Sequence, residues 1–433
     1  MPTKPPAHEK VVPGQPQKRG FLQKIGPGIV TGASDDDPSG IGTYSQVGAQ
    51  FGFAMLWTML FSYPLMSAVQ MISARIGRTT GRGIAGNIRL HYPTWLLYSM
   101  VGLLLAANII NIGADLGAMG AAIQMLVGGP PLAYVVAIAV LSAGLQVFIP
   151  YRKYVRYLKW LTLSLFAYVA TVVVVHVPWA VALRQTILPS LKFTREYLTA
   201  FIAVLGTTIS PYLFFWQASQ EVEDVEACPE ERPLRESPRQ APSQLERIRI
   251  DTLLGMAFSN IVAWAIILTT AATLHAHGET DIATAEQAAK ALAPLAGRLA
   301  FVLFAAGIIG TGLLAVPVLA GSAAYSVGEA LKWPVGLERK PRHARGFYAV
   351  IATATLVGAG QNFLHINPIK ALFWTAVING VVAVPVLVVM MLVSGNVKVM
   401  GKFAVGGKLK VFGWITAFVM LLAAVGMFAT MGG

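Results

Sequence analysis

Charged side chains are scarce in this sequence. Only 12% of its 433 residues are Asp, Glu, Lys or Arg, whereas 55% are hydrophobic and the mean hydropathy is +0.61. Soluble domains carry about 25% charged residues, so this composition excludes a soluble globular protein and predicts an integral membrane protein. Cys228 is the single cysteine, so no intrachain disulfide can form. The stretch 1–20 has no apolar core, and we do not expect a cleavable signal peptide there.

Apolar runs of about 20 residues predict transmembrane helices. They are interrupted by Gly and Pro, as is usual in closely packed membrane helices, and not by long polar stretches. The predicted spans are 24–50, 52–74, 94–126, 131–150, 158–178, 198–222, 249–275, 298–330, 346–361, 367–393 and 411–430. We therefore predict eleven transmembrane helices.

The net charge of +13 is explained by membrane topology and not by nucleic-acid binding. With a cytoplasmic N-terminus, all but six of the 33 Lys and Arg residues fall in the tail and the cytoplasmic connections. This is the positive-inside distribution, and it predicts a multi-pass protein of the inner or plasma membrane. The charged connection 221–249 is expected to be a solvated cytoplasmic loop, with an ion-attracting vestibule as the alternative.

Three consecutive aspartates, Asp35, Asp36 and Asp37, lie inside the first predicted span. A charged side chain at the bilayer centre costs roughly 2.5–3.5 kcal/mol, so three uncompensated aspartates would cost about 7–10 kcal/mol. Pro38 removes a backbone donor and Gly40 tolerates almost any conformation, so we expect the helix to break here. Irregular backbone at membrane depth is tolerated inside protein or beside a water-filled cavity, where carboxylates and free carbonyls can form a cation site.

The sixth predicted span is broken as well, because Pro211 follows the polar run 206–210. Four spans separate the two broken helices, which must therefore cross the membrane in opposite directions. Interrupted spans in halves of opposite orientation are typical of inverted-repeat transporters. We predict an all-α membrane protein with a 5+5 inverted repeat and one added helix. Its parts are a cytoplasmic tail at 1–23, repeats at 24–178 and 198–393, and the added helix at 411–430.

Oxygen-bearing groups gather at the two breaks. Within each break they are spaced three residues apart, so they share a helix face. The predicted metal ligands are Ser34, Asp37, Gly40, Thr207 and Ser210. Oxygen-only sites suit Mg²⁺, Ca²⁺ or Mn²⁺, whereas sulfur ligands favour softer metals. Two alternatives to metal binding remain. The Thr207 and Ser210 hydroxyls would hydrogen-bond to the backbone of their own helix, and Asp37 would pair with a helix end.

Four further polar residues are predicted to lie beside the site or in its vestibule. They are Asp36, Asp115, Tyr212 and Asn379. Asp36 cannot face the same ion as Asp37, because successive helical positions differ by about 100°. The alternative to a role at the site is that Asp115 is a structural hydrogen-bond acceptor and that Asn379 is a packing residue.

The stretch from Gly26 to Ala49 resembles the first helix of the NRAMP metal transporters, whose motif is Asp-Pro-Gly-Asn. Residues 206–212 resemble their sixth helix, whose motif ends Met-Pro-His. The resemblance implies a LeuT-type fold and transport of divalent cations. The sequence also departs from the family's pattern. The positions of the family's Asn, Met and His hold Gly40, Ser210 and Tyr212. Asp115 fits the Asp-Leu pattern of the third helix, but Ala118 replaces the acidic residue expected after it.

These departures resemble the NRAMP-related magnesium transporters. Loss of sulfur removes a preference for softer ions, and smaller side chains leave room for a partly hydrated ion. None of the seven histidines falls at mid-depth, so we predict Mg²⁺ and Mn²⁺ transport by alternating access without obligatory proton coupling. The alternative is a proton-coupled Mn²⁺/Fe²⁺ symporter.

Two other classes of function remain as rivals. A transporter of the same fold with an amino acid or amine as substrate would use the carboxylate to bind an ammonium group. An intramembrane metalloenzyme would need a second catalytic motif, which the sequence lacks, so we expect no enzymatic activity and no cofactor. The expected partners are the transported cation and the lipid bilayer. The sequence is compatible with a monomer but leaves the oligomeric state open.

Overall fold

The computed structural model describes residues 27–149 and 161–431. Within these ranges every regular element is a helix and no strand occurs. The α-helices are α1 (Pro27–Asp35), α2 (Pro38–Phe51), α3 (Trp57–Thr80), α4 (Ile84–His91), α5 (Thr94–Val127), α6 (Pro131–Phe148), α8 (Phe166–Val174), α9 (Trp179–Ile187), α10 (Arg195–Thr208), α11 (Pro211–Ala227), α12 (Ala241–Thr273), α13 (Ala285–Ala289), α14 (Ala293–Ala296), α15 (Ala300–Leu331), α16 (Arg345–Gly360), α17 (Pro368–Gly395), α18 (Val397–Met400) and α19 (Gly407–Met431).

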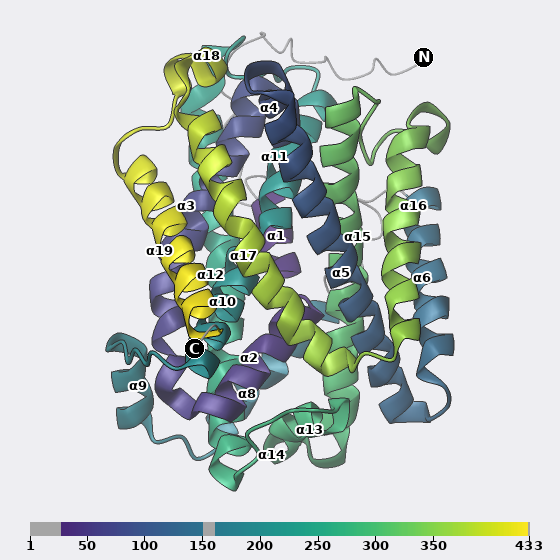
Figure 1. Cartoon of the computed structure of the whole chain (residues 1–433), viewed down its shortest axis with the longest axis vertical. Helices are drawn as coiled ribbons and strands as arrows, with labels where there is room; N and C mark the ends of the chain where they lie inside the picture. The colour runs from purple at the N-terminus through teal and green to yellow at the C-terminus, as the bar shows by residue number, and fades with distance from the viewer. Residues whose placement is uncertain (1–26, 150–160, 432–433) are drawn as a thin grey trace, which may run out of the picture.

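Both predicted helix breaks are present. The first span stops at Asp35 and restarts at Pro38, and the sixth stops at Thr208 and restarts at Pro211. Each second half begins with proline at its first turn, where the missing N–H would have had no helical partner. Figure 1 shows α1 leading down to α2 and α10 leading up to α11, so the two broken spans run in opposite directions.

The predicted spans coincide with helices or helix pairs of the structure. In the described part of the chain, eight helices are long and apolar enough to cross a membrane, or nine if α2 and α3, which meet at 108°, are counted as one span. Helix α1, the first half of the first span, has only 9 residues and is too short to cross a membrane alone. The predicted span 158–178 lies partly outside the described residues, and its described helix is α8. The repeat boundaries at 24–178 and 198–393 stay predictions.

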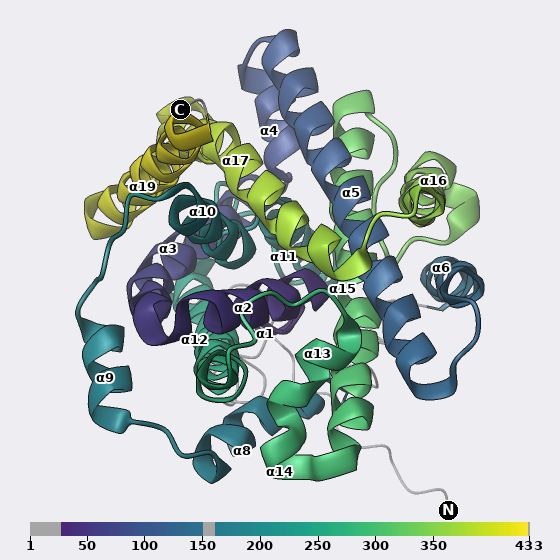
Figure 2. The same ribbon diagram turned by 60° about the horizontal axis from the view of Figure 1, so that its bottom comes forward.

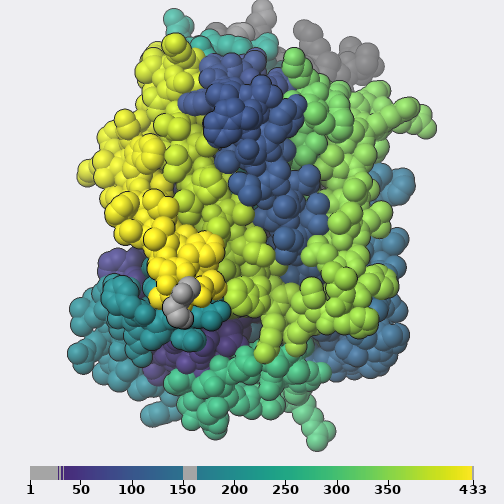
Figure 3. Space-filling view, viewed as in Figure 1, coloured from purple at the N-terminus to yellow at the C-terminus, as the bar shows by residue number. Residues whose placement is uncertain are grey.

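The broken helices form the centre of the bundle. Figure 2, seen towards the lower end, shows α1 and α2 in the middle, with α12, α10, α17, α5 and α15 around them. On the face shown in Figure 3, α19, α17, α5 and α16 cover the core. Large apolar side chains of α19 point outward, as expected for lipid contact. They are Val411, Phe412, Trp414, Ile415, Phe418, Leu421, Leu422, Val425 and Phe428.

A close contact with α17 determines the position of α10. A Cβ atom on Gly206 would lie 2.0 Å from the carbonyl oxygen of Ala376 and 2.4 Å from the backbone nitrogen of Gly380. No larger residue fits there, so glycine lets α10 and α17 approach backbone to backbone, as small residues do in membrane helices. Thr207 follows directly, and its position is therefore set by this contact.

Residues 221–249 are not a fully solvated loop, and that prediction is wrong for much of the segment. Helix α11 continues to Ala227 and α12 begins at Ala241. The intervening chain bonds back to α3, because the N–H groups of Leu234 and Arg235 donate to the carbonyls of Arg78 and Thr79.

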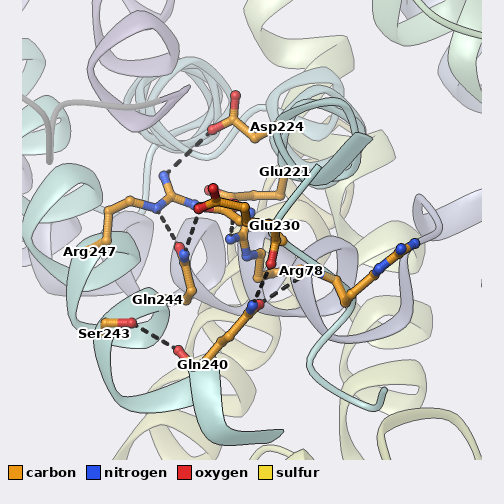
Figure 4. Close-up of polar contacts among 10 residues, drawn as sticks. Arg78, Glu221, Asp224, Glu230, Gln240, Ser243, Gln244 and Arg247 are labelled. Carbon is orange, nitrogen blue, oxygen red and sulfur yellow. Dashed lines mark hydrogen bonds and ion pairs between the residues drawn. The ribbon is translucent and has the colours of Figure 1, made fainter. Parts of the chain in front are cut away.

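A buried charge cluster holds this segment in place (Figure 4). Arg247 of α12 pairs with Glu221 of α11, and Arg78 of α3 pairs with Glu231 of the connection. Gln244 links the two pairs, because it donates to Glu231 over 3.0 Å and accepts from Arg247 over 3.0 Å. The charges are compensated internally, so the cluster ties three spans together instead of forming an open vestibule.

Candidate cation site

Asp37 is the N-cap of α2. Its Oδ1 accepts hydrogen bonds from the Gly40 N–H over 2.7 Å and from the Ser39 hydroxyl over 2.9 Å. Its Oδ2 accepts from the Asn111 amide over 3.0 Å and lies 3.5 Å from the Tyr212 hydroxyl. The side chain is 2% exposed. One oxygen therefore stabilises the helix start, as the alternative interpretation allowed, while the other faces α5 and α11.

The residues around Oδ2 form one connected network. Tyr212 donates to the Ser34 carbonyl over 3.0 Å, which joins α11 to the end of α1. The Asn111 amide nitrogen also lies 3.3 Å from Asp115 Oδ2, and the Asn111 oxygen accepts from Asn379 of α17 over 3.3 Å. The network thus draws on both halves of the chain.

Gly40 and Thr207 face each other across the breaks. A Cβ atom on Gly40 would lie 3.1 Å from Thr207 Cγ2 and 3.5 Å from Asp37 Oδ1. The Thr207 hydroxyl is buried and has no hydrogen-bond partner in the described part of the chain. Ser210 instead bonds back to the carbonyls of Gly206 and Thr207, each over 2.8 Å, as its alternative interpretation stated.

The other two aspartates turn towards α12. The Ser259 hydroxyl lies 2.6 Å from Asp35 Oδ2 and 3.2 Å from Asp36 Oδ1. Asp36 is fully buried in this structure and is not exposed to a vestibule. Asp35 and Asp36 therefore face α12, whereas Asp37 faces α5 and α11.

Acidic and imidazole groups do not converge around one point. Among the described residues, no group of three or more His, Cys, Asp or Glu is arranged to hold a metal ion. A cation at Asp37 would have to draw on hydroxyl, amide and carbonyl oxygens, which are ligands for hard cations.

The match to known proteins extends over nearly the whole chain. A family model described as natural resistance-associated macrophage protein-like matches residues 28–430. The chain belongs to this family. A relative from Klebsiella pneumoniae, named divalent metal cation transporter MntH, is 25% identical over 88% of this chain and 87% of its own length. A relative of the same name from Acidiphilium cryptum is 26% identical over 82% of this chain and 78% of its own length.

Solved structures show the same fold for this NRAMP family member. A manganese transporter from Eremococcus coleocola superposes with a TM-score of 0.75 at 17% identity, and the match covers 97% of this chain and 90% of the other. A nucleobase-cation-symport-1 family transporter, Mhp1, superposes with a TM-score of 0.57 at 13% identity, and the match covers 96% of this chain and 94% of the other. The LeuT-type inverted-repeat fold is thus confirmed.

Two residues that contact the aspartates of the break were not among the predicted site residues of this NRAMP chain. Asn111 connects Asp37, Asp115 and Asn379, and Ser259 contacts Asp35 and Asp36. Asn111 is one helical turn before Asp115, so the pair lies on one polar face of α5. Ser259 carried no such signal, because a lone serine in an apolar helix more often bonds to its own backbone.

Proposed function

We propose that the protein carries Mg²⁺, and also Mn²⁺, across the membrane by alternating access without obligatory proton coupling. The carried ion binds at Asp37, with Ser34, Gly40, Thr207 and Ser210 around it and Asp36, Asp115, Tyr212 and Asn379 close by. The repeats at 24–178 and 198–393 move relative to each other, and the N-terminal tail lies on the cytoplasmic side.

The surroundings of Asp37 support this proposal. Among the described residues, every side chain that hydrogen-bonds to its carboxylate offers a hydroxyl or an amide, and none offers sulfur or imidazole nitrogen. Such donors suit Mg²⁺ and Mn²⁺. The relatives named as divalent metal cation transporters support the ion class.

The absence of a side-chain ligand at Gly40 supports an ion that keeps some of its water. A Cβ atom there would lie only 3.1 Å from Thr207 Cγ2 and 3.5 Å from Asp37 Oδ1, so the two breaks are in close contact at this position. Mg²⁺ gives up its water reluctantly and is usually held through one or two carboxylates. A membrane potential of 100 mV is worth about 4.6 kcal/mol for a divalent cation, which drives uptake without a second ion.

A proton-coupled Mn²⁺/Fe²⁺ symporter is the second candidate. One observation favours it: Asn111 contacts both Asp37 and Asp115, so a proton acceptor lies one residue away from the proposed site. Acidic chains within the membrane are a usual feature of proton relays.

Liposomes containing a Mg²⁺ indicator and a pH indicator separate the two candidates. An inside-negative potential is imposed without a pH gradient, and Mg²⁺ or Mn²⁺ is added outside. Influx of both ions with a flat pH trace supports the proposal. Influx of Mn²⁺ alone, with acidification in proportion, contradicts it and favours the symporter.

Replacement of the proposed ligand provides the control. Asp37→Ala should reduce transport to the rate of empty liposomes, because the only carboxylate among the five proposed ligands is removed. Glu226→Gln alters a carboxylate that is 57% exposed and should transport like the wild type. Normal transport by Asp37→Ala would show that the site assignment is wrong.

A further inference from the structure

A cavity of about 350 Å³ lies at the end of the molecule that carries α13 and α14, opposite α4 and α18 (Figure 1). Three stretches of chain enclose it: α2, the start of α17, and the connection 280–282 that precedes α13. Figure 2, in which this end comes forward, shows α2 between α17 and α13. The cavity therefore lies beside the helix that Asp37 caps.

Hydrogen bonds join the three walls of the cavity. Gln46 of α2 donates to the Thr280 carbonyl over 3.2 Å and accepts from the Ile282 N–H over 2.9 Å. Asn367, the N-cap of α17, donates to the Ala283 carbonyl over 2.9 Å. The connection before α13 is thus tied to α2 on one side and to α17 on the other.

The wall formed by α2 leads towards the proposed cation site. Gly42, Gln46 and Gln50 line the cavity, and their spacing of four residues places them on one face of the helix. Gly42 is the innermost of the three. It lies about 7.5 Å along α2 from Asp37, at 1.5 Å per residue.

The wall formed by α17 leads to the same place. Trp374 lines the cavity and lies on the same helix as Asn379, whose amide bonds to Asn111 of the network around the site. Leu372 is fully buried and packs on α2, because a Cβ atom on Gly42 would lie 2.8 Å from its Cδ1 atom. This contact closes the space between α2 and α17 at the inner end of the cavity.

One ion pair lies at the rim. Of the described residues that line the cavity, Asp281 is the only acidic one and Lys370 the only basic one. Their charged groups are 3.2 Å apart, and both side chains are more than half exposed. Surface pairs of this kind are worth at most about 1 kcal/mol, so this pair opens readily and contributes little to the stability of the fold.

The cavity has room for a hydrated cation. Each water takes about 30 Å³ of liquid volume, so the octahedral water shell of Mg²⁺ needs roughly 180 Å³. The side-chain amides of Gln46 and Gln50 lie along the wall, and amide oxygens accept hydrogen bonds from such waters. An ion that keeps its water can therefore occupy this space without direct ligands.

We propose that Asp281 attracts the hydrated cation that is to be carried into this cavity, and that Lys370 limits the attraction by pairing with Asp281. The inference rests on the proposed function, because the attracted ion is the one carried at Asp37, and on the cytoplasmic tail, which places this end outside. A charge acts on ions within about 8 Å at physiological ionic strength. The pair therefore sets how often a cation is present next to the inner end of the cavity, without ligating the carried ion.

The concentration dependence of Mn²⁺ uptake into liposomes tests the two charges, which have opposite expected effects. Asp281→Asn leaves Lys370 unpaired and should raise the KM about threefold, whereas Lys370→Gln leaves Asp281 unpaired and should lower it about threefold. The maximal rate should stay as in the wild type, because neither residue contacts the Asp37 network. Both shifts should vanish at about 1 M salt, where charges act over only about 3 Å.

Lys290 provides a matched control at the same end of the molecule. It pairs with Glu279 over 3.1 Å, and its side chain is 52% exposed, as is that of Lys370, but it does not line the cavity. Lys290→Gln should leave the KM unchanged. Unchanged KM values in Asp281→Asn and Lys370→Gln, or the same shift in Lys290→Gln as in Lys370→Gln, would overturn the inference.

Thiol labelling measures the attraction without transport. Thr280→Cys in a Cys228→Ser background places a single thiol at the cavity. Lys370→Gln should raise the ratio of its reaction rates with a cationic and an anionic methanethiosulfonate about threefold, and Lys290→Gln should not. An unchanged ratio in Lys370→Gln would overturn the inference. A wild type that carries neither ion would contradict the proposed function, whereas a raised ratio would still support the attraction of cations into the cavity.

Discussion

The two carboxylate oxygens of Asp37 have different hydrogen-bond partners. Oδ1 is engaged by the first turn of α2, and Oδ2 faces the side chains of Asn111 and Tyr212. The cap fixes the orientation of the carboxylate, so less ordering would be required for the proposed ion to bind there. The same residue thus restarts the helix and presents an oxygen at the break.

Ser210 is the residue at which ion preference can be tested. Ser210→Met would place a thioether where the hydroxyl now bonds to Gly206 and Thr207. Sulfur favours softer ions, so the ratio of Cd²⁺ to Mg²⁺ transport should rise by about tenfold, which corresponds to about 1.4 kcal/mol. Initial uptake rates of the two ions in liposomes measure this ratio. Ser210→Ala should not raise it, and an equal rise in both variants would exclude a role for sulfur.

Among the elements, α10 depends most clearly on a single contact. Gly206 lies against the backbone of α17 at Ala376 and Gly380, and Thr207 follows it at the break. The contact therefore links helix packing to the position of a proposed ligand.

Gly206→Ala should destabilise the protein. The added methyl group would meet backbone atoms that cannot move aside, and overpacking of this kind typically costs about 1–3 kcal/mol. The melting temperature in detergent should fall, and transport should fall with it. Gly102→Ala is a matched control in α5, because no atom lies within 4 Å of its added Cβ. A similar drop for both variants would mean that the close contact is not the cause.

The charge cluster joining α3, α11 and α12 should also contribute to stability. Arg247→Ala leaves Glu221 buried without its closest partner, and removal of one member of a buried pair costs about 3–5 kcal/mol. Arg339→Ala breaks a pair that is 47% and 57% exposed, and such surface pairs are worth at most about 1 kcal/mol. Thermal unfolding of both variants in detergent should separate them clearly. Equal melting temperatures would contradict the importance of burial.

At the scale of the whole molecule, the basic connections gather at one end. Helices α4 and α18, which contain Arg89 and Lys398, lie at the upper end in Figure 1, and α9, α13 and α14 lie at the lower end. From the positive-inside rule we expect the upper end to be cytoplasmic.

The single cysteine allows this orientation to be tested. Cys228 follows α11 and lines a cavity of about 400 Å³ together with Gly81 and Glu226. In whole cells a membrane-impermeant maleimide should leave Cys228 unlabelled until the membrane is permeabilised. Thr280→Cys in a Cys228→Ser background adds an exposed thiol after α12 and should be labelled at once. The reverse pattern would show that the N-terminus is not cytoplasmic.

The sequence alone was sufficient to predict that the protein is a membrane protein, that two spans are broken and that the broken spans run in opposite directions. These features depend on local chemistry: apolar runs long enough to cross a bilayer, and prolines that stop a helix wherever it lies. These features can be predicted from residues that are close together in the sequence, without knowing which distant residues they contact.

Tertiary structure alone decided which helix each aspartate faces. Ser259 lies 224 residues from Asp35 and Asn111 lies 74 from Asp37, so only the packing of α12 and α5 on the break brings them together. Burial of the charge cluster in the 221–249 segment could not be predicted either, because the sequence does not show which helices carry the partners of these charges. Hydrophobic periodicity indicates which residues are buried, but contacts between polar groups depend on how closely and at what rotation the helices meet.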